Sequence, residues 1–387
     1  MIKFLLNTVH RVKPTFSKGG KLAFLRATFD AFESFLFVPN SVTQKGTHIR
    51  DANDLKRVMT VVIVAVLPAL LFGMWNVGIQ HFLAMGVPTG FFATFWYGFL
   101  KVIPLVLVSY IVGLGIEFTS AQIRGHEVNE GYLVTGMLIP LIMPVDVPLW
   151  MLALAVAFSV IIGKEIFGGT GMNIWNPALL ARAFLFFAYP SRMSGSTVWI
   201  AGLTKGTGMV DGFSGATPLA NAAAGVDIPS LQQLFIGTIP GSVGETSTLC
   251  ILLGAALLLY TGVASWKVML SCVAGALSVG FLSNGLAVNP YMELPAYYHL
   301  LLGGFAFGAV FMATDPVTGA QTETGKWIYG FLIGAFTICL RLFNPGYPEG
   351  MMLAILLMNT FAPLIDHYVV QSSIRRRTKH IDRSPTQ

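Results

Sequence analysis

Ten apolar segments constrain the fold of this chain more than any other feature. Only 11% of its 387 residues are charged and 54% are hydrophobic, whereas a soluble domain carries about 25% charged residues. The sequence therefore predicts an all-α integral membrane protein with about ten transmembrane segments. The segments cover residues 58–75, 95–116, 132–144, 148–163, 177–189, 246–262, 267–286, 299–313, 327–343 and 350–370.

Three of these segments are shorter than the roughly 20 residues that a helix needs to cross a bilayer. They are 132–144, 177–189 and 299–313, and Pro or Gly bounds each of them. We expect these three to form half-helices or tilted, broken helices.

The same order of features occurs in both halves of the chain. A short helix is followed by proline, a longer helix, a basic residue, an Asn-Pro pair and a final helix. The landmarks are Met143-Pro144, Lys164 and Asn176-Pro177 in one half, and Asp315-Pro316, Arg341 and Asn344-Pro345 in the other. Five segments per half is an odd number, so a second copy would run inverted across the membrane, as in many transport folds. The alternative is chance recurrence of helices bounded by proline.

The basic residues gather at the two ends of the chain, which carries a net charge of +6. Residues 1–57 hold ten Lys/Arg against four Asp/Glu. Because cytoplasmic segments of membrane proteins are enriched in Lys and Arg, both termini are predicted to be cytoplasmic, and nucleic acid is not an expected partner. The predicted regions are 1–56 with an amphipathic helix over 21–38, a first repeat 57–189, a periplasmic loop 190–245, a second repeat 246–370 and a basic tail 371–387.

The loop contains the motif Asp211-Gly-Phe-Ser-Gly-Ala-Thr217. A covalent ester to Thr217 needs an exposed hydroxyl, and Gly215 and Ala216 leave little bulk beside it. Gly212 and Gly215 also permit backbone angles that are closed to other residues. The alternative interpretation is a Gly/Ser loop with a turn at Gly215.

Two asparagines flank the start of a predicted short helix. Asn176 followed by Pro177 is a favourable N-cap and first-turn pair, so capping alone explains Asn176. The functional alternative is that Asn173 and Asn176 present amide groups to the polar edge of a ring-shaped ligand.

Charged residues inside apolar segments are functional candidates because they are costly there. Glu117, Asp315 and Asp366 offer the oxygen ligands that a sodium path requires. The alternatives are structural: Asp315 as a cap of the Pro316 turn, and Lys164 with Glu165 as an interfacial pair.

Gly113, Gly115 and Gly131 bring backbones close together on the predicted inner side. Small residues in membrane helices mostly serve packing, and a quinone pocket is the alternative. The chain has no motif for acid/base catalysis, zinc or a nucleotide. The run Gly168-Gly-Thr-Gly171 follows a membrane helix and lacks the dinucleotide spacing, so we expect an NADH site on another protein.

Taken together, the motifs resemble the NqrB/RnfD family of membrane subunits from sodium-translocating NADH:quinone reductases and their ferredoxin-linked relatives. The resemblance is carried by His48-Ile-Arg-Asp51, Gly125-His-Glu-Val-Asn-Glu-Gly131, Ile162–Gly171, Asn176-Pro-Ala-Leu, Arg182–Pro190, Asp211–Thr217, Ala313-Thr-Asp-Pro-Val317 and Phe361–His367.

The resemblance implies that FMN is bound covalently through its phosphate to Thr217, and that a flavin transferase recognises Asp211, Ser214, Gly215 and Ala216. It further implies three other sites. They are riboflavin at Asn173 and Asn176, quinone near Gly113, Gly115 and Gly131, and a sodium path through Glu117, Asp315 and Asp366.

The activity implied is electron transfer to quinone coupled to Na⁺ export, by a complex of six subunits (A to F) in the bacterial inner membrane. Two alternatives stay open. One is an RnfD-type subunit of a ferredoxin:NAD oxidoreductase, and the other is a transporter of the inverted-repeat type without redox groups.

Overall fold

The computed structural model describes residues 55–125, 131–203, 215–226, 228–288, 290–344 and 349–381, together with 11–16 and scattered residues before Leu55. All regular elements in these stretches are helical and none is a strand, which confirms the predicted all-α class. Helices overlap each of the ten predicted apolar segments. The predicted amphipathic helix over 21–38 lies largely outside the described residues.

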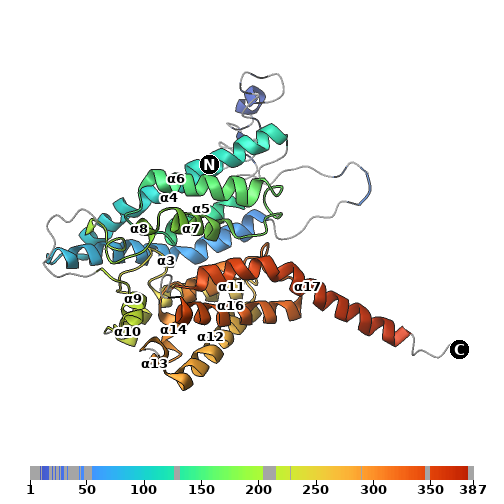
Figure 1. The fold of residues 1–387 in the computed structure, drawn as a ribbon. Coiled ribbons are helices and arrows are strands. Elements are labelled where there is room, and N and C mark those ends of the chain that lie inside the picture. The colour runs from blue at the N-terminus through green and yellow to red at the C-terminus, as the bar shows by residue number, and fades with distance from the viewer. Residues whose placement is uncertain are drawn as a thin grey trace.

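The first half of the chain forms one group of helices, shown from blue to green in Figure 1. Its members are α3 (Leu55–Ala84), α4 (Phe91–Arg124), α5 (Tyr132–Leu141), α6 (Leu149–Val160) with the π-helical η2 (Ile161–Glu165), α7 (Pro177–Ala188) and α8 (Pro190–Met193).

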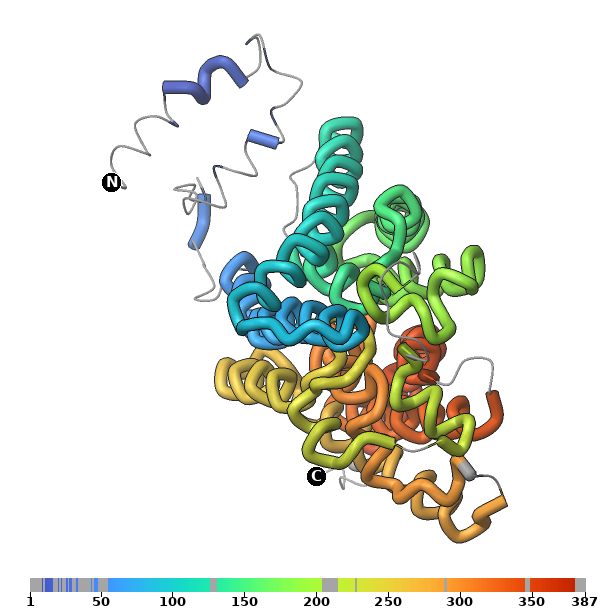
Figure 2. The backbone as a smooth tube through the Cα atoms, turned by 90° about the vertical axis from the view of Figure 1, so that its left-hand side faces the viewer, coloured from blue at the N-terminus to red at the C-terminus, as the bar shows by residue number. Residues whose placement is uncertain are grey.

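The second half forms another group, which lies beside the first in both views (Figures 1 and 2). Its members are α9 (Pro218–Ala223), α10 (Leu231–Ile236), α11 (Thr248–Tyr260), α12 (Trp266–Leu286), α13 (Pro290–Glu293), α14 (Tyr298–Leu301), α15 (Phe305–Phe307) with the π-helical η4 (Gly308–Met312), α16 (Glu323–Phe343) and α17 (Met351–Ile381).

Among the described residues, five helices are long and apolar enough to cross a membrane, so the chain is a multi-pass membrane protein. They are α3, α4, α12, α16 and α17. Helices α5, α7 and α11 are apolar but only 10, 12 and 13 residues long. The short helices predicted over 132–144 and 177–189 are therefore confirmed.

The segment 299–313 is broken, as the sequence predicts, and is divided into α14, α15 and η4. Gly303 adopts a φ of 64° directly after α14. This left-handed conformation is readily available to glycine and ends the helix there.

Glycines let the long helices approach one another closely. A Cβ atom at Gly98 of α4 would lie 1.7 Å from the carbonyl oxygen of Met74 in α3, and one at Gly334 of α16 would lie 1.9 Å from that of Cys272 in α12. Lipid offers no hydrophobic driving force between helices, so such close backbone packing stabilises their association.

The two groups meet where α3 packs on α11. A Cβ atom at Gly254 of α11 would lie 2.3 Å from the carbonyl oxygen of Ala65 in α3. Along the same boundary lie the break before α7 and the break before α16, each of which follows a π-helical segment. The fold thus brings two irregular stretches, from opposite halves of the chain, to one interface.

Candidate functional site

Thr217 lies at the start of the short helix α9 and lines a cavity of about 380 Å³, which we call the Thr217 cavity. Its hydroxyl accepts the backbone N–H of Ala220 at 3.2 Å, so Thr217 is the N-cap of α9. Pro218 occupies the first helical position, where its missing N–H costs nothing. The cap therefore holds the hydroxyl in one orientation at the edge of an open space.

The motif around Thr217 is described only in part. Gly215, Ala216 and Thr217 are described, whereas Asp211, Gly212 and Ser214 lie outside the described residues. Gly215 is not among the described glycines with a positive φ, so the backbone freedom that glycine permits is not what this position uses. Glycine is required there for another reason: a Cβ atom would lie 2.4 Å from the carbonyl oxygen of Ser196.

A buried ionic cluster lines the same cavity. Arg182 of α7 donates to the carbonyl oxygen of Ile142 at 2.6 Å and to Glu245 at 2.9 Å. It also forms a very short ion pair with Glu349, just before α17. The side chains of Arg182 and Glu245 are only 4% and 6% exposed. Arg182 is the single cation among the described residues that line this cavity.

The two carboxylates of this cluster compete for one guanidinium. Burial and, to a smaller extent, the charge of Glu349 raise the pKa of Glu245, Arg182 lowers it, and the net result is a pKa of about 8. In the described part of the chain, Oε1 of Glu349 is buried without a hydrogen-bond partner. Gain or loss of one proton at Glu245 therefore changes the net charge of the cluster.

Sequence reasoning did not select this cluster as a site. Arg182 is a charged residue inside an apolar segment, and such residues are functional candidates by default. Its position inside an apolar segment could therefore have marked Arg182 as a candidate. The cluster itself could not be predicted, because Arg182 lies 63 residues from Glu245 and 167 residues from Glu349 in the sequence.

A second cavity, of about 100 Å³, lies between the two helix groups and is lined by Asn173, Asn176 and Asp315. Oδ1 of Asn176 accepts the N–H groups of Ala178 and Leu179 at 2.9 and 3.4 Å, which confirms the capping role.

The amide nitrogen of Asn176 donates to Asp315, so its polar atoms are occupied. Asn173 donates to the carbonyl oxygen of Trp175 at 3.1 Å. Pockets for small organic ligands usually measure about 300–1,000 Å³. A riboflavin ring therefore does not fit this cavity in the form described.

Asp315 caps the turn before α16. Its Oδ1 accepts the N–H of Val317 at 3.0 Å, and its Oδ2 accepts the hydroxyl of Thr318 at 2.9 Å and the amide of Asn176 at 3.2 Å. The structural alternative for Asp315 is thus confirmed, and the sodium role stays a prediction.

Glu117 pairs with Lys164 in the interior of the first helix group. The pair is very short, and both side chains are less than 5% exposed. The predicted pairing of Lys164 with Glu165 is wrong, because adjacent residues on a helix do not face each other. Glu165 instead accepts the hydroxyl of Ser120 at 2.5 Å and lies 3.5 Å from Arg124.

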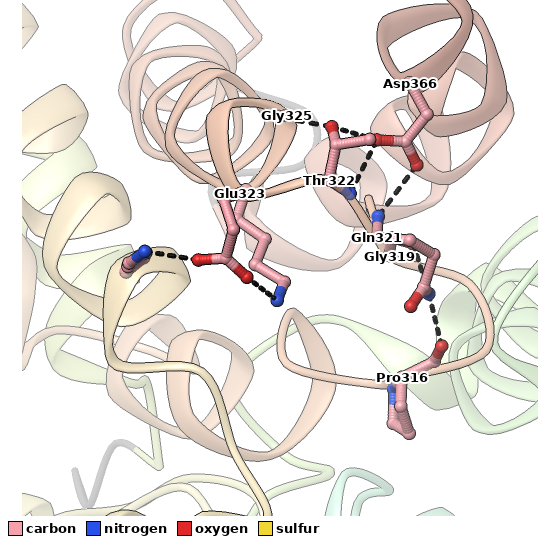
Figure 3. Close-up of polar contacts among 9 residues, drawn as sticks. Pro316, Gly319, Gln321, Thr322, Glu323, Gly325 and Asp366 are labelled. Atoms are coloured by element: carbon pink, nitrogen blue, oxygen red, sulfur yellow. Dashed lines mark hydrogen bonds and ion pairs between the residues drawn. The ribbon is translucent and has the colours of Figure 1, made fainter. Parts of the chain in front are cut away.

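Asp366 of α17 holds the backbone at the start of α16 (Figure 3). Its carboxylate accepts the N–H of Gln321 at 2.7 Å, the N–H of Thr322 at 2.9 Å and the Thr322 hydroxyl at 2.5 Å. The carboxylate thereby satisfies backbone N–H groups at the start of α16, where the helix offers them no acceptor. The structure gives Asp366 this capping role, and its sodium role stays a prediction.

The three glycines of the predicted quinone site are not brought together on one face. A Cβ atom at Gly113 would overlap the ring of Tyr132, whereas Gly115 faces open space. Gly131 lies against Thr170 and borders the second cavity. Gly113 is therefore a packing position, because the Tyr132 ring occupies its surface. No cluster of His, Cys, Asp and Glu suited to a metal occurs in the described residues.

A family model and the individual relatives all place this chain in one protein family. The sequence model of the NQR2, RnfD, RnfE family matches residues 42–375. The chain is 46% identical to the B subunit of the Na(+)-translocating NADH-quinone reductase of Chromohalobacter salexigens, over 96% of each chain. It is 46% identical to the same subunit of the Ectopseudomonas mendocina reductase, over 95% of this chain and 97% of that relative. The corresponding protein of Azotobacter vinelandii is 44% identical, with the same coverage.

Proposed function

Because the chain belongs to the NQR2, RnfD, RnfE family, we propose that it is the B-type membrane subunit of a sodium-translocating NADH–quinone reductase. Near-full-length identity of 46% to relatives with that name supports this assignment over the RnfD-type alternative. The other five subunits of the complex are the partners that this role requires, and NADH is oxidised on one of them.

The proposed topology has ten membrane segments in two inverted five-segment repeats. Both termini lie in the cytoplasm of a bacterial inner membrane, and the loop 190–245 lies in the periplasm. The support is the helix in each of the ten apolar segments and the excess of Lys and Arg before the first segment and after the last.

Thr217 is the proposed attachment point of FMN, through a phosphate ester formed by a separate flavin transferase. The observation that carries this proposal is the Thr217 hydroxyl itself, which is held by α9 at the edge of a cavity of about 380 Å³. That volume lies within the usual range for organic ligands. Arg182 lines the same cavity, where Glu245 and Glu349 already pair with its guanidinium.

The chain's own residues would position and shield such a group. Gly215 packs against the carbonyl oxygen of Ser196 and fixes the backbone beside the hydroxyl. The Arg182 cluster provides charge of both signs in the cavity wall. Bound there, FMN would supply the one- and two-electron chemistry that no amino acid side chain offers.

Riboflavin, quinone and sodium complete the proposed role. Asn173 is the better of the two asparagines for riboflavin, because the polar atoms of Asn176 are occupied by α7 and Asp315. The boundary between the helix groups must widen before a ring can enter it. Export of one charge against the membrane potential requires about 2.3 kcal/mol per 100 mV, which electron transfer to quinone would supply.

The test is the mass of the Thr217 peptide and its flavin fluorescence in a denaturing gel, from a host that contains the transferase. We expect an FMN-sized adduct in the wild type and its loss in Thr217→Ala. Thr217→Ser keeps a hydroxyl and is the matched control for folding. Unmodified wild-type peptide from such a host would contradict the FMN proposal and favour a transporter without redox groups.

A further inference from the structure

A polar recess lies between the first turns of α12 and α16. It shares no lining residue with the Thr217 cavity. It has a volume of about 330 Å³, and its lining includes Ser265, Trp266, Lys267, Gln321, Glu323 and Lys326. We call it the α12–α16 recess. None of the proposed flavin and quinone positions lies in it, so its lysines have no role in the function proposed above.

Two ammonium groups converge in the recess on one carboxylate (Figure 3). Nζ of Lys326 lies 2.8 Å from Oε1 of Glu323, and Lys267 forms a very short ion pair with Oε2. The side chains of Lys267 and Lys326 are 27% and 24% exposed, whereas that of Glu323 is 65% exposed. The positive charge is therefore deeper, and the carboxylate sits at the mouth, where an incoming anion can replace it.

The other acid at the recess forms no ion pair with these lysines among the described residues. Asp315 borders the recess, but both of its oxygens accept hydrogen bonds from Val317, Thr318 and Asn176. The charge balance facing the opening is thus two lysines against Glu323. This arrangement suits an anion with several oxygens, because each ammonium can donate to a different one.

Two tryptophans indicate the depth of the recess in the bilayer. Trp266 and Trp327 pack edge to face, with ring centroids 5.7 Å apart, and are 53% and 39% exposed. Tryptophan is enriched at the level of the lipid head groups. Both α12 and α16 are long enough to cross the membrane, so the recess lies at the end of two spans.

Exposed apolar side chains follow in sequence on both helices, within two turns of the recess residues. Leu270 of α12 is 50% exposed, and Ile328 and Phe331 of α16 are each 41% exposed. A ligand that fits the whole feature has an anionic oxygen-rich end and an apolar body. Phospholipids have this chemistry, and basic recesses between membrane helices are known to bind their head groups.

We propose that the α12–α16 recess binds the phosphate of an anionic phospholipid, with Lys267 and Lys326 as its ligands and the acyl chains along Leu270 and Phe331. Glu323 is the internal competitor that the lipid phosphate displaces. This proposal does not depend on the redox role, since it uses only the ends of α12 and α16.

The test is lipid binding to the intact membrane assembly, purified in mild detergent and stripped of lipid. Phosphatidylglycerol and phosphatidylcholine are titrated separately, and bound lipid is counted by native mass spectrometry. We expect tighter binding of phosphatidylglycerol. Lys267→Ala with Lys326→Ala should weaken it by roughly tenfold to thirtyfold, because each lysine near the surface contributes about one decade or slightly less.

Three variants make the test specific. Glu323→Gln should tighten phosphatidylglycerol binding, because it removes the competitor. Lys267→Arg with Lys326→Arg should retain binding and shows that the helices still fold. Arg375→Ala with Arg376→Ala, in α17, removes the same charge elsewhere and should leave binding unchanged.

Two results would overturn the proposal. One is equal loss of binding in the lysine and α17 arginine variants, which would mean that only net charge matters. The other is displacement of the lipid by millimolar inorganic phosphate, which would identify a soluble phosphate, and not a lipid, as the ligand.

Discussion

The side-chain amide of Asn176 donates a hydrogen bond to Asp315 across 3.2 Å, and so joins two helix breaks that lie 139 residues apart in the chain. Each residue also satisfies its own break. Asn176 accepts the first N–H groups of α7, and Asp315 accepts the N–H of Val317 in the turn before α16. One contact therefore couples the ends of two short, irregular segments at the boundary between the helix groups.

Substitution of Asn176 tests this coupling. Asn176→Ala removes an N-cap, which costs about 1 kcal/mol, and leaves a buried oxygen of Asp315 with one donor fewer, which costs about 1–3 kcal/mol. Asn176→Asp keeps the cap but places a second carboxylate beside Asp315. We expect the aspartate variant to be the less stable of the two at pH 7 and to recover as the pH falls.

The measurement is the thermal unfolding midpoint in detergent at pH 5 and pH 7. Asn344→Ala changes an exposed amide after α16 and is the control. Equal midpoints for the aspartate and alanine variants at pH 7 would show that Asn176 and Asp315 are not coupled.

The buried pair of Glu117 and Lys164 gives a second prediction. Removal of one partner from a buried ion pair costs about 3–5 kcal/mol, whereas replacement of both by apolar groups is often neutral. We expect Lys164→Met alone to lower the unfolding midpoint strongly, and Glu117→Leu with Lys164→Met to restore most of it.

Arg124→Ala is the matched control for this pair. It removes a cation whose side chain is 41% exposed, and exposed pairs contribute at most about 1 kcal/mol. A double variant no more stable than Lys164→Met would mean that the pair does not account for the loss.

Local signals in the sequence predicted much of this structure. The ten helical segments follow from runs of apolar residues, and the Asn176 cap follows from the Asn-Pro pair, because both depend on neighbours in the chain. The partner of Lys164 could not be predicted in this way. Glu165 is adjacent in sequence but points elsewhere, and Glu117 lies 47 residues away.

The site shows the same limit. The sequence points to Thr217 through a local motif, and the structure adds the cavity and the Arg182 cluster around it. That cluster joins α7, the segment before α11 and the turn before α17, so it depends on how three distant elements pack. Gly215 is a similar case, since the carbonyl oxygen of Ser196 that excludes a side chain there comes from another part of the loop.

Asp366 gives a third prediction, on local stability. Its carboxylate accepts three hydrogen bonds from Gln321 and Thr322, so Asp366→Ala leaves these donors without their acceptor. We expect faster hydrogen exchange over residues 321–325 and a smaller increase in Asp366→Asn, which keeps one acceptor oxygen. Hydrogen exchange with mass spectrometry measures this directly.

The effect of sodium on hydrogen exchange distinguishes the capping role of Asp366 from its predicted role in the sodium path. If the carboxylate serves only as a cap, exchange over 321–325 is the same with and without sodium. Protection of this turn by sodium, lost in Asp366→Ala but not in Lys326→Ala, would instead support the sodium-path prediction.

The pH dependence of stability gives the last prediction, and it concerns Glu245. Its pKa is raised from 4.5 to about 8, chiefly by burial. A raised carboxyl pKa means that the folded state binds the proton more tightly than the unfolded state. The stabilisation is fully present below about pH 4.5, falls as the pH rises toward 8 and is lost above it. Glu245→Gln stays neutral throughout, so its unfolding midpoint should vary less between pH 5 and pH 8.

Glu349→Gln is the informative partner variant. It removes the carboxylate that raises the pKa of Glu245, so the decline in stability should become shallower without disappearing. Glu323→Gln, at an exposed carboxylate, should follow the wild-type curve. A wild-type curve that is flat from pH 5 to pH 8 would mean that Arg182 keeps Glu245 ionised over this range. The cavity wall beside Thr217 would then hold a fixed set of charges instead of a titrating one.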